Sequence, residues 1–408
     1  MSATPSVSAR PGGISSAHAP ALDLPARFMA LGMVIFCALA VAAPWTMPLL
    51  LGSFYDPRLL AFVHLNTLGV IGAVIVGASY QLVPVVLQTP LASVRLGRLS
   101  FWCYLGGLIA LPIGLLRSWL PALAAGGALL ALGFGLYIGV VLTTVRRAPH
   151  RDVIAWHIAV ATIGVLGGVT YGVILALNKG MGFLGGHTLD NLAAHATVML
   201  GGWVAVLLAG VAYRLAGMFT LAEDALWLPG AWLGLSLTAG GAWVLSTNIH
   251  LGGPPILDLL GAAALCGGMV VFLGQLVHLY WNRRRRGPDV HIPFALTAAV
   301  AGVAATALLV IGFWRGPGPS APIWIAAGWL AIAGFAETAI QGFFYKIATF
   351  LVWLKRYAPL AGRQRVPKLE ELYGRRLALA GWALWTAGVL LEAVAVGTGN
   401  EGLSRVAG

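Results

Sequence analysis

The chain has 408 residues, of which 59% are hydrophobic and only 9% are charged, and its mean hydropathy is +0.87. A soluble protein of this size needs a polar surface that this composition cannot supply, so a water-soluble globular protein is excluded. The formal net charge of +12 does not require nucleic acid as a partner, because the basic residues lie between the apolar runs. Membrane lipid is the partner that this composition predicts.

Residues 1–26 are rich in Ser, Ala, Pro and Gly and lack the apolar stretch of a signal peptide, so we expect a disordered cytoplasmic tail. Eleven apolar runs follow, and each can supply the roughly 20 residues that a transmembrane helix needs. In chain order they cover residues 27–51, 59–87, 100–119, 121–145, 152–177, 191–219, 226–247, 255–281, 291–314, 321–354 and 376–397. The tenth run is long enough to continue beyond the bilayer as a cytoplasmic helix. The predicted fold class is therefore an all-α membrane protein with about eleven transmembrane helices.

The positions of the basic residues predict the orientation of these helices. With the N-terminus inside, 20 of the 25 Lys and Arg residues fall on the inner side of the membrane. The outer side then holds Arg58, Arg117, Lys179, Arg315 and Arg405. Because short cytoplasmic loops carry an excess of Lys and Arg, this asymmetry favours an N-in, C-out topology. Attraction to anionic lipid of the inner leaflet accounts for the remaining basic character.

A Gly-x-x-Tyr pattern recurs near the inner ends of the second, sixth and tenth predicted helices. Its tyrosines, Tyr80, Tyr213 and Tyr345, are 133 and 132 residues apart. Such a fixed period indicates internal repeats, and four helices per repeat would keep the repeats parallel. We therefore predict a pseudo-threefold bundle of three repeats, the last of them truncated, at residues 27–151, 152–288 and 289–408. The tyrosines themselves are expected in the aromatic belt at the membrane surface.

Two histidines inside apolar runs are the main candidates for chemistry. His64 lies roughly 9 Å below Arg58 and His195 roughly 8 Å below Asp190, if each residue rises 1.5 Å along its helix, so both lie near the outer face. Relative to the repeat tyrosines, His195 is displaced by two residues from the position of His64, which is about 200° around a helix. Neutral imidazoles from two helices can hold a haem iron between them. Each imidazole could equally well form a hydrogen bond with a neighbouring helix, and the spacing alone leaves both interpretations open.

Other ionisable residues lie in apolar runs, where charge is costly and function is a default hypothesis. They are His157, His278, Asp258, Glu337 and Glu392. Glu337 and Gln341 share one helix face, and either a proton relay, an ion site or a protonated Glu held between helices would explain Glu337. We assign no residue a catalytic role. The remaining histidines, which we expect in water, are His18, His150, His187, His250 and His291.

Three segments carry a resemblance to a known family: HLNTLGVIGAVIVGASYQLVP at 64–84, AHATVMLGGWVAVLLAGVAYRL at 194–215 and GFFYKIATFLVWLKRY at 342–357. They resemble segments of haem-copper oxidase subunit I-like membrane proteins, whose core subunit is a twelve-helix bundle with threefold pseudosymmetry. A weaker similarity connects the chain to NnrS-type haem and copper membrane proteins of the nitric oxide response.

The family pattern places a haem-ligating histidine in helix two, copper ligands in helices six and seven, and two haem ligands in helix ten. His64 matches the helix-two ligand, and His195 lies in helix six without the HPEVY-like context. The tenth helix has Trp329 and Glu337 but no histidine. The resemblance therefore implies a degenerate member without a complete oxygen-reducing centre, in which His64 and His195 ligate one haem, b-type by expectation, while copper is unlikely.

Such a member would transfer electrons to or from a respiratory partner, or respond to NO or O2, in the inner membrane of a bacterium. Two other classes stay open. A proton- or ion-coupled transporter would use the buried acids along a polar path, and a cofactor-free scaffold of a respiratory assembly would need neither haem nor a path. Whether the chain is an enzyme is left undecided by the sequence.

Overall fold

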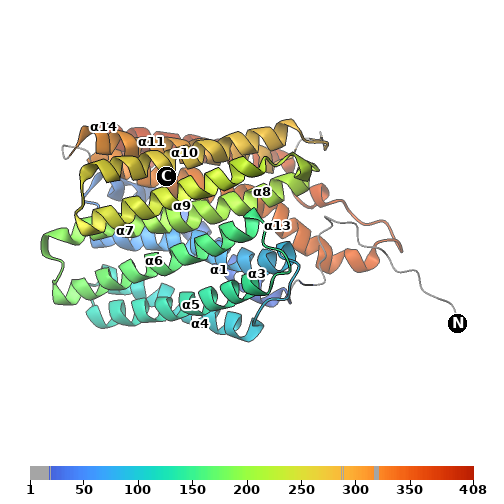
Figure 1. Ribbon diagram of the computed structural model, residues 1–408, viewed down its shortest axis with the longest axis horizontal. Helices are drawn as coiled ribbons and strands as arrows, with labels where there is room; N and C mark the ends of the chain where they lie inside the picture. The colour runs from blue at the N-terminus through green and yellow to red at the C-terminus, as the bar shows by residue number, and fades with distance from the viewer. Residues whose placement is uncertain (1–17, 19, 286, 288, 317–320) are drawn as a thin grey trace.

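The structure is a computed structural model that describes residues 18, 20–285, 287, 289–316 and 321–408. The predicted tail therefore falls largely outside the described residues, which include only His18 before residue 20. The described chain forms helices and no β-strand, and eleven of its helices are long and apolar enough to cross a membrane. These helices lie side by side along the long axis of one bundle (Figure 1). The predicted all-α membrane fold is confirmed.

Seven of the spans are single α-helices, and four are composite. The single helices are α4 (Val94–Leu116), α5 (Leu120–Arg147), α6 (Val153–Met181), α9 (Leu228–Leu251), α10 (Pro255–Trp281), α11 (His291–Arg315) and α14 (Arg375–Thr398). The first span joins α1 (Asp23–Thr46) to a 3-10 segment, η2 (Met47–Leu51). The other composite spans are α2 (Pro57–His64), η3 (Leu65–Gly72) and α3 (Ala73–Val86); α7 (Thr188–Thr197), η5 (Val198–Ala205) and α8 (Val206–Thr220); and α12 (Ala321–Trp329), η7 (Leu330–Glu337) and α13 (Thr338–Arg356).

The segments η3, η5 and η7 are π-helical, and they begin at Leu65, Val198 and Leu330. These starts are 133 and 132 residues apart, which is the spacing of the repeat tyrosines. A π-helical turn is wider than an α-helical turn and is frequently found at functional sites. The wider turn leaves room for a hydrogen bond from outside the helix: the Tyr104 hydroxyl donates to the carbonyl oxygen of Leu68 at 2.5 Å. The hydropathy of the sequence does not distinguish these π-helical segments from α-helix.

Most helix ends lie within a few residues of their predicted positions, but α1 and α4 begin earlier than expected. α1 begins at Asp23 and α4 at Val94, while the predicted starts were 27 and 100. The first turns of both helices are charged, and the Arg98 guanidinium pairs with the Asp23 carboxylate at 3.0 Å. Because a charged turn can stay helical at the membrane surface, a prediction from apolar runs starts such helices too late.

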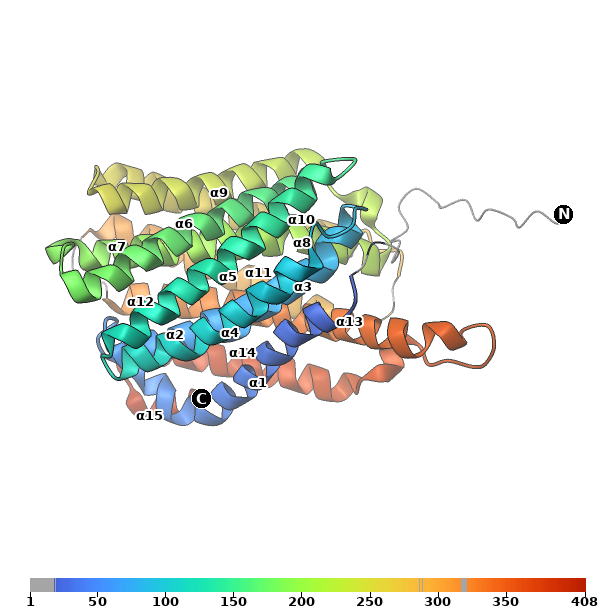
Figure 2. The same cartoon turned by 90° about the horizontal axis from the view of Figure 1, so that it is seen from below.

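The tenth span extends beyond the other helices, as expected from its length. α13 and the loop after it protrude from one end of the bundle (Figure 2). We call this end, which also holds the α10–α11 connection, the inner end, and the opposite end the outer end. At the outer end a short helix that was not predicted, α15 (Glu401–Ala407), folds back after α14.

The repeat tyrosines do not form the expected aromatic belt. Tyr80 and Tyr213 are buried in the bundle, and the Tyr80 hydroxyl lies 2.7 Å from the Ser100 hydroxyl. Their Gly-x-x-Tyr context recurs because these positions pack helices together, so the prediction of a lipid-facing belt was wrong for both residues.

His291, which was expected in water, is instead completely buried at the inner end. Its Nδ1 lies 2.8 Å from Oδ1 of Asp289, whose other oxygen, Oδ2, lies 2.6 Å from Nζ of Lys346. Burial alone would raise the pKa of the Asp289 carboxyl, but the close contacts and charges of His291 and Lys346 outweigh burial and lower this pKa. The cluster thus joins α11 to α13 through a buried ion pair. His291 was expected in water because it is the first residue of a predicted span, and the sequence does not show that a neighbouring helix buries it.

We expect Lys346→Met to destabilise the protein by about 3 kcal/mol, because a buried carboxylate would lose its cation. The measurement is the thermal unfolding of the detergent-solubilised variant beside wild type. Because the pKa of Asp289 is lowered, the stability that its carboxylate contributes is complete above the ordinary pKa of 3.8. This stability is lost as the pH falls through the lowered pKa. Glu370→Gln is the control, because it removes only the half-exposed ion pair with Arg285 and should change little. Equal stability of both variants would contradict the role given to the cluster.

Candidate functional site

The structure brings His64 and His195 together in the outer half of the bundle. Their ring centroids are 6.4 Å apart and their planes differ by 21°. His64 is the last residue of α2, and His195 lies near the end of α7, so each ring lies close to the start of a π-helical segment. Both rings line one cavity of about 310 Å³. The two predicted ligands are thus neighbours in space, although 131 residues separate them in the chain.

Backbone carbonyl groups fix the orientation of both rings. Nδ1 of His64 lies 2.7 Å from the Leu60 oxygen, and Nδ1 of His195 lies 2.9 Å from the Gly168 oxygen. A carbonyl oxygen can only accept, so each Nδ1 must carry the proton and donate it. In a neutral imidazole the proton on Nδ1 leaves Nε2 with a free lone pair, which is the arrangement that metal-ligating histidines use. Within the described residues, neither Nε2 atom has a hydrogen-bond partner.

The two rings meet although His195 is displaced by two residues from the repeat position of His64. Their approach depends on how α2 and α7 are arranged around the shared cavity. The helix of His195 packs on α6, where Gly172 leaves room for the ring: a Cβ atom at Gly172 would lie 3.3 Å from Cε1 of His195.

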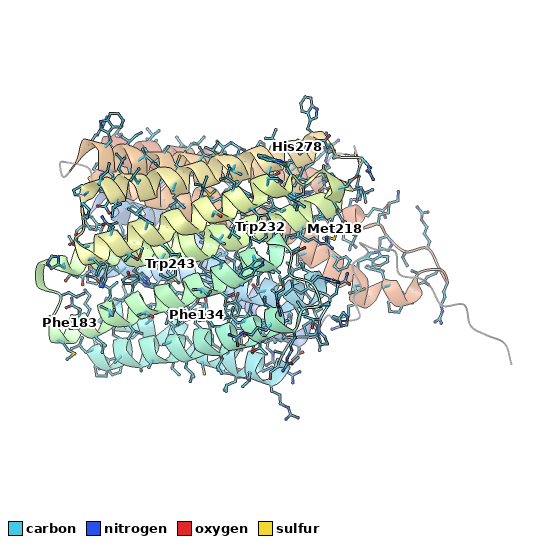
Figure 3. The ribbon with its side chains drawn as sticks, viewed as in Figure 1. Phe134, Phe183, Met218, Trp232, Trp243 and His278 are labelled. Atoms are coloured by element: carbon cyan, nitrogen blue, oxygen red, sulfur yellow. The ribbon has the colours of Figure 1, made fainter. Side chains whose placement is uncertain are left out.

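The cavity between the two histidines is almost entirely apolar. Its wall comes from seven spans and includes Leu111, Phe134, Val173, Trp203 and Ile332. Phe134 lies on α5 (Figure 3) and is buried. An apolar wall keeps water away and disfavours charged imidazole. Among the described residues, no three His, Cys, Asp or Glu side chains gather closely enough to hold one metal ion.

Two residues of the cavity wall, and one residue that bonds the π-helical segment after His64, were not predicted. Met199 lines the cavity one turn after His195, and Trp203 lines it one turn further. The i, i+4 spacing from His195 could have indicated both residues. Tyr104, whose hydroxyl bonds the π-helical segment η3, gave no signal in the sequence, because its partner is a backbone group 36 residues away.

The other ionisable candidates lie apart from this cavity. His157 is buried, and its Nδ1 donates to the Val153 oxygen at 2.8 Å. His278 is exposed at the inner end of α10 (Figure 3). Glu337 is 3% exposed, and neither its Oε1 atom nor Nε2 of Gln341 has a hydrogen-bond partner within the described chain.

Two further acids lie toward the outer end and are hydrogen-bonded. Glu392 is fully buried and accepts from the Ser404 hydroxyl at 2.9 Å. Asp258 accepts from Nδ2 of Asn248 at 2.8 Å. Neither acid lines the cavity of the two histidines.

Two comparisons with known proteins give no relative, so the functional argument rests on the geometry of this site. No protein-family model matches the chain, and the search of curated proteins finds no matching relative.

Proposed function

We propose that the protein binds one haem between His64 and His195 and uses it for electron transfer or for the response to a diatomic gas. The observation that carries the proposal is the pair of nearly parallel imidazole rings, 6.4 Å apart, that line one apolar cavity with both Nδ1 protons held by carbonyl groups. The proposal rests on no similarity to a known haem protein beyond the sequence segments quoted above.

The donor set suits haem better than a metal ion held by protein alone. An ion bound by both Nε2 atoms at ~2 Å from each nitrogen would keep the ring centres roughly 6 Å apart, and the observed separation is 6.4 Å. Two imidazoles are too few ligands for most protein-only metal sites, whereas haem brings four nitrogens of its own, and His64 and His195 would suffice to hold it. The apolar wall would pack against a macrocycle, and a volume of about 310 Å³ is at the lower end of the range for ligand pockets.

Each group of the chain would then have a defined task. Haem, when bound, supplies a one-electron redox centre. The carbonyl groups of Leu60 and Gly168 hold the rings in the ligating tautomer and raise their basicity. The apolar wall excludes water and so affects the reduction potential. Because His64 and His195 would both hold the haem iron, electron transfer is favoured over gas binding. A respiratory protein in a bacterial inner membrane is the partner that we infer.

A proton- or ion-coupled transporter is the second candidate. The observation that favours it is the buried Glu337, whose Oε1 atom has no hydrogen-bond partner among the described residues, one turn before Gln341. An uncompensated carboxyl group inside a membrane is costly and is often functional. This reading predicts proton or ion flux and no visible pigment.

A visible spectrum of the purified wild-type protein, expressed with sufficient haem supply, separates the two candidates. We expect sharp reduced-minus-oxidised haem bands with about one haem per chain. A folded but colourless protein would overturn the haem proposal, and flux measurements in proteoliposomes would then test the role of Glu337.

A further inference from the structure

A second and larger cavity, of about 550 Å³, lies beside the cavity of the two histidines. Its walls come from α7, η5, α9, α10, α11, α12 and η7. It thus lies between the π-helical segments η5 and η7, whereas the cavity of the histidines lies between η3 and η5. Nothing in the proposed haem function uses this space.

The cavity is polar at one end and apolar along its depth. Asp190 and Asp258 line the outer end, while Met269 and Phe335 line the deep part. From Asp258 to Met269 the wall of α10 runs for 11 residues, or roughly 16 Å. Such a space accepts an elongated molecule with an apolar body and a polar head.

The charges at the outer end select the sign of that head. The described residues that line the cavity include two carboxylates and no lysine, arginine or histidine. The amide of Asn248, a residue that is only 8% exposed, donates a hydrogen bond to Asp258. This bond uses only one carboxylate oxygen, Oδ1. Asp190 lies 3.2 Å from Nδ1 of the exposed His187. The second oxygen of Asp258 therefore remains available to a cationic head.

Aromatic rings at the same end add a second feature that favours a cation. Phe313 and Trp324 line the cavity near the outer ends of α11 and α12, and their ring centroids are 4.8 Å apart. The faces of aromatic rings attract ammonium groups, most strongly where water is excluded. A phosphate group would instead be repelled by the two carboxylates, so a phospholipid fits this end poorly.

We propose that this second cavity binds an amphipathic organic cation, with its ammonium head at Asp258 and Asp190 and its apolar body along α10 and α11. This cavity shares the wall residues Leu192, Ala196 and Gly328 with the cavity of the two histidines, but neither histidine lines it, and the proposal does not depend on haem.

The test uses the full-length protein in nanodiscs of zwitterionic lipid and equilibrium dialysis with a labelled phenylalkyl-trimethylammonium ion. Its uncharged tert-butyl isostere is the matched probe. We expect saturable binding of the cation to the wild-type protein. The isostere should bind about tenfold more weakly, and so should the cation to Asp258→Asn. In each case a hydrogen bond or contact to a charged group would be lost. Ala193→Trp, which fills the cavity from its exposed wall, should remove binding.

Glu401→Gln is the control, because Glu401 is an exposed acid on α15 that pairs with Arg405 and does not line the cavity. It should bind the cation as wild type does. Equal binding of the cation and its isostere would show simple apolar partition and overturn the proposal. Absence of saturable binding, or unchanged affinity in Asp258→Asn with a wild-type melting temperature, would also overturn it.

Discussion

His64→Ala and His195→Ala are each expected to lower the haem content of the purified protein by more than about tenfold. Loss of the outer-shell partner of a metal-ligating histidine already costs roughly 10- to 100-fold in metal affinity, so loss of the ligand itself should cost at least as much. Any haem that remains should show the spectrum of an iron with one imidazole. The measurement is the ratio of haem to protein, together with the reduced-minus-oxidised spectrum.

A structural role for the histidines would give a different result. His64→Gly opens space for free imidazole, and added imidazole should restore the haem bands if His64 is a ligand, whereas a misfolded variant would not respond. His278→Ala is the matched control, since His278 is exposed at the inner end of α10. Unchanged haem content in both His64→Ala and His195→Ala would place any haem elsewhere and contradict the site.

The helices could be predicted from the sequence because membrane spans are governed by one strong requirement. A segment without water must satisfy its own backbone hydrogen bonds, so apolar runs of sufficient length become helices. The exceptions, at Asp23 and Val94, are turns whose charges lie at the membrane surface. The π-helical segments and the packing of α15 depend on contacts between distant parts of the chain, which hydropathy does not record.

The candidate site could be predicted only in part. The identity and the depth of His64 and His195 could be predicted, since an imidazole inside an apolar run is conspicuous. Their facing could not be derived, because it depends on how α2 and α7 are arranged around the cavity. The carbonyl group of Gly168, which fixes the tautomer of His195, belongs to a third span. The buried cluster of Asp289, His291 and Lys346 escaped prediction for the same reason.

Gly164→Ala is expected to destabilise the protein by about 3 kcal/mol, the upper part of the range for overpacking a core. Gly164 lies on α6 where the helix touches the backbone of η5. A Cβ atom there would lie 2.6 Å from the carbonyl carbon of Gly202 and 3.0 Å from the nitrogen of Trp203. Because both atoms belong to the backbone, no side chain can rotate away, and α6 must separate from η5. Thermal unfolding in detergent measures the effect.

The same separation should also lower the haem content, because the Gly168 carbonyl that holds His195 is one turn further along α6. Gly139→Ala on α5 is the control: a Cβ atom there would meet nothing within 4 Å, and alanine has the higher helix propensity by about 1 kcal/mol. It should therefore leave stability and haem content unchanged or slightly raised. If Gly164→Ala matched this control in both measurements, the close contact of α6 with η5 would not determine the position of His195. The relative position of His64 and His195 would then have to depend on α2 and α7 alone.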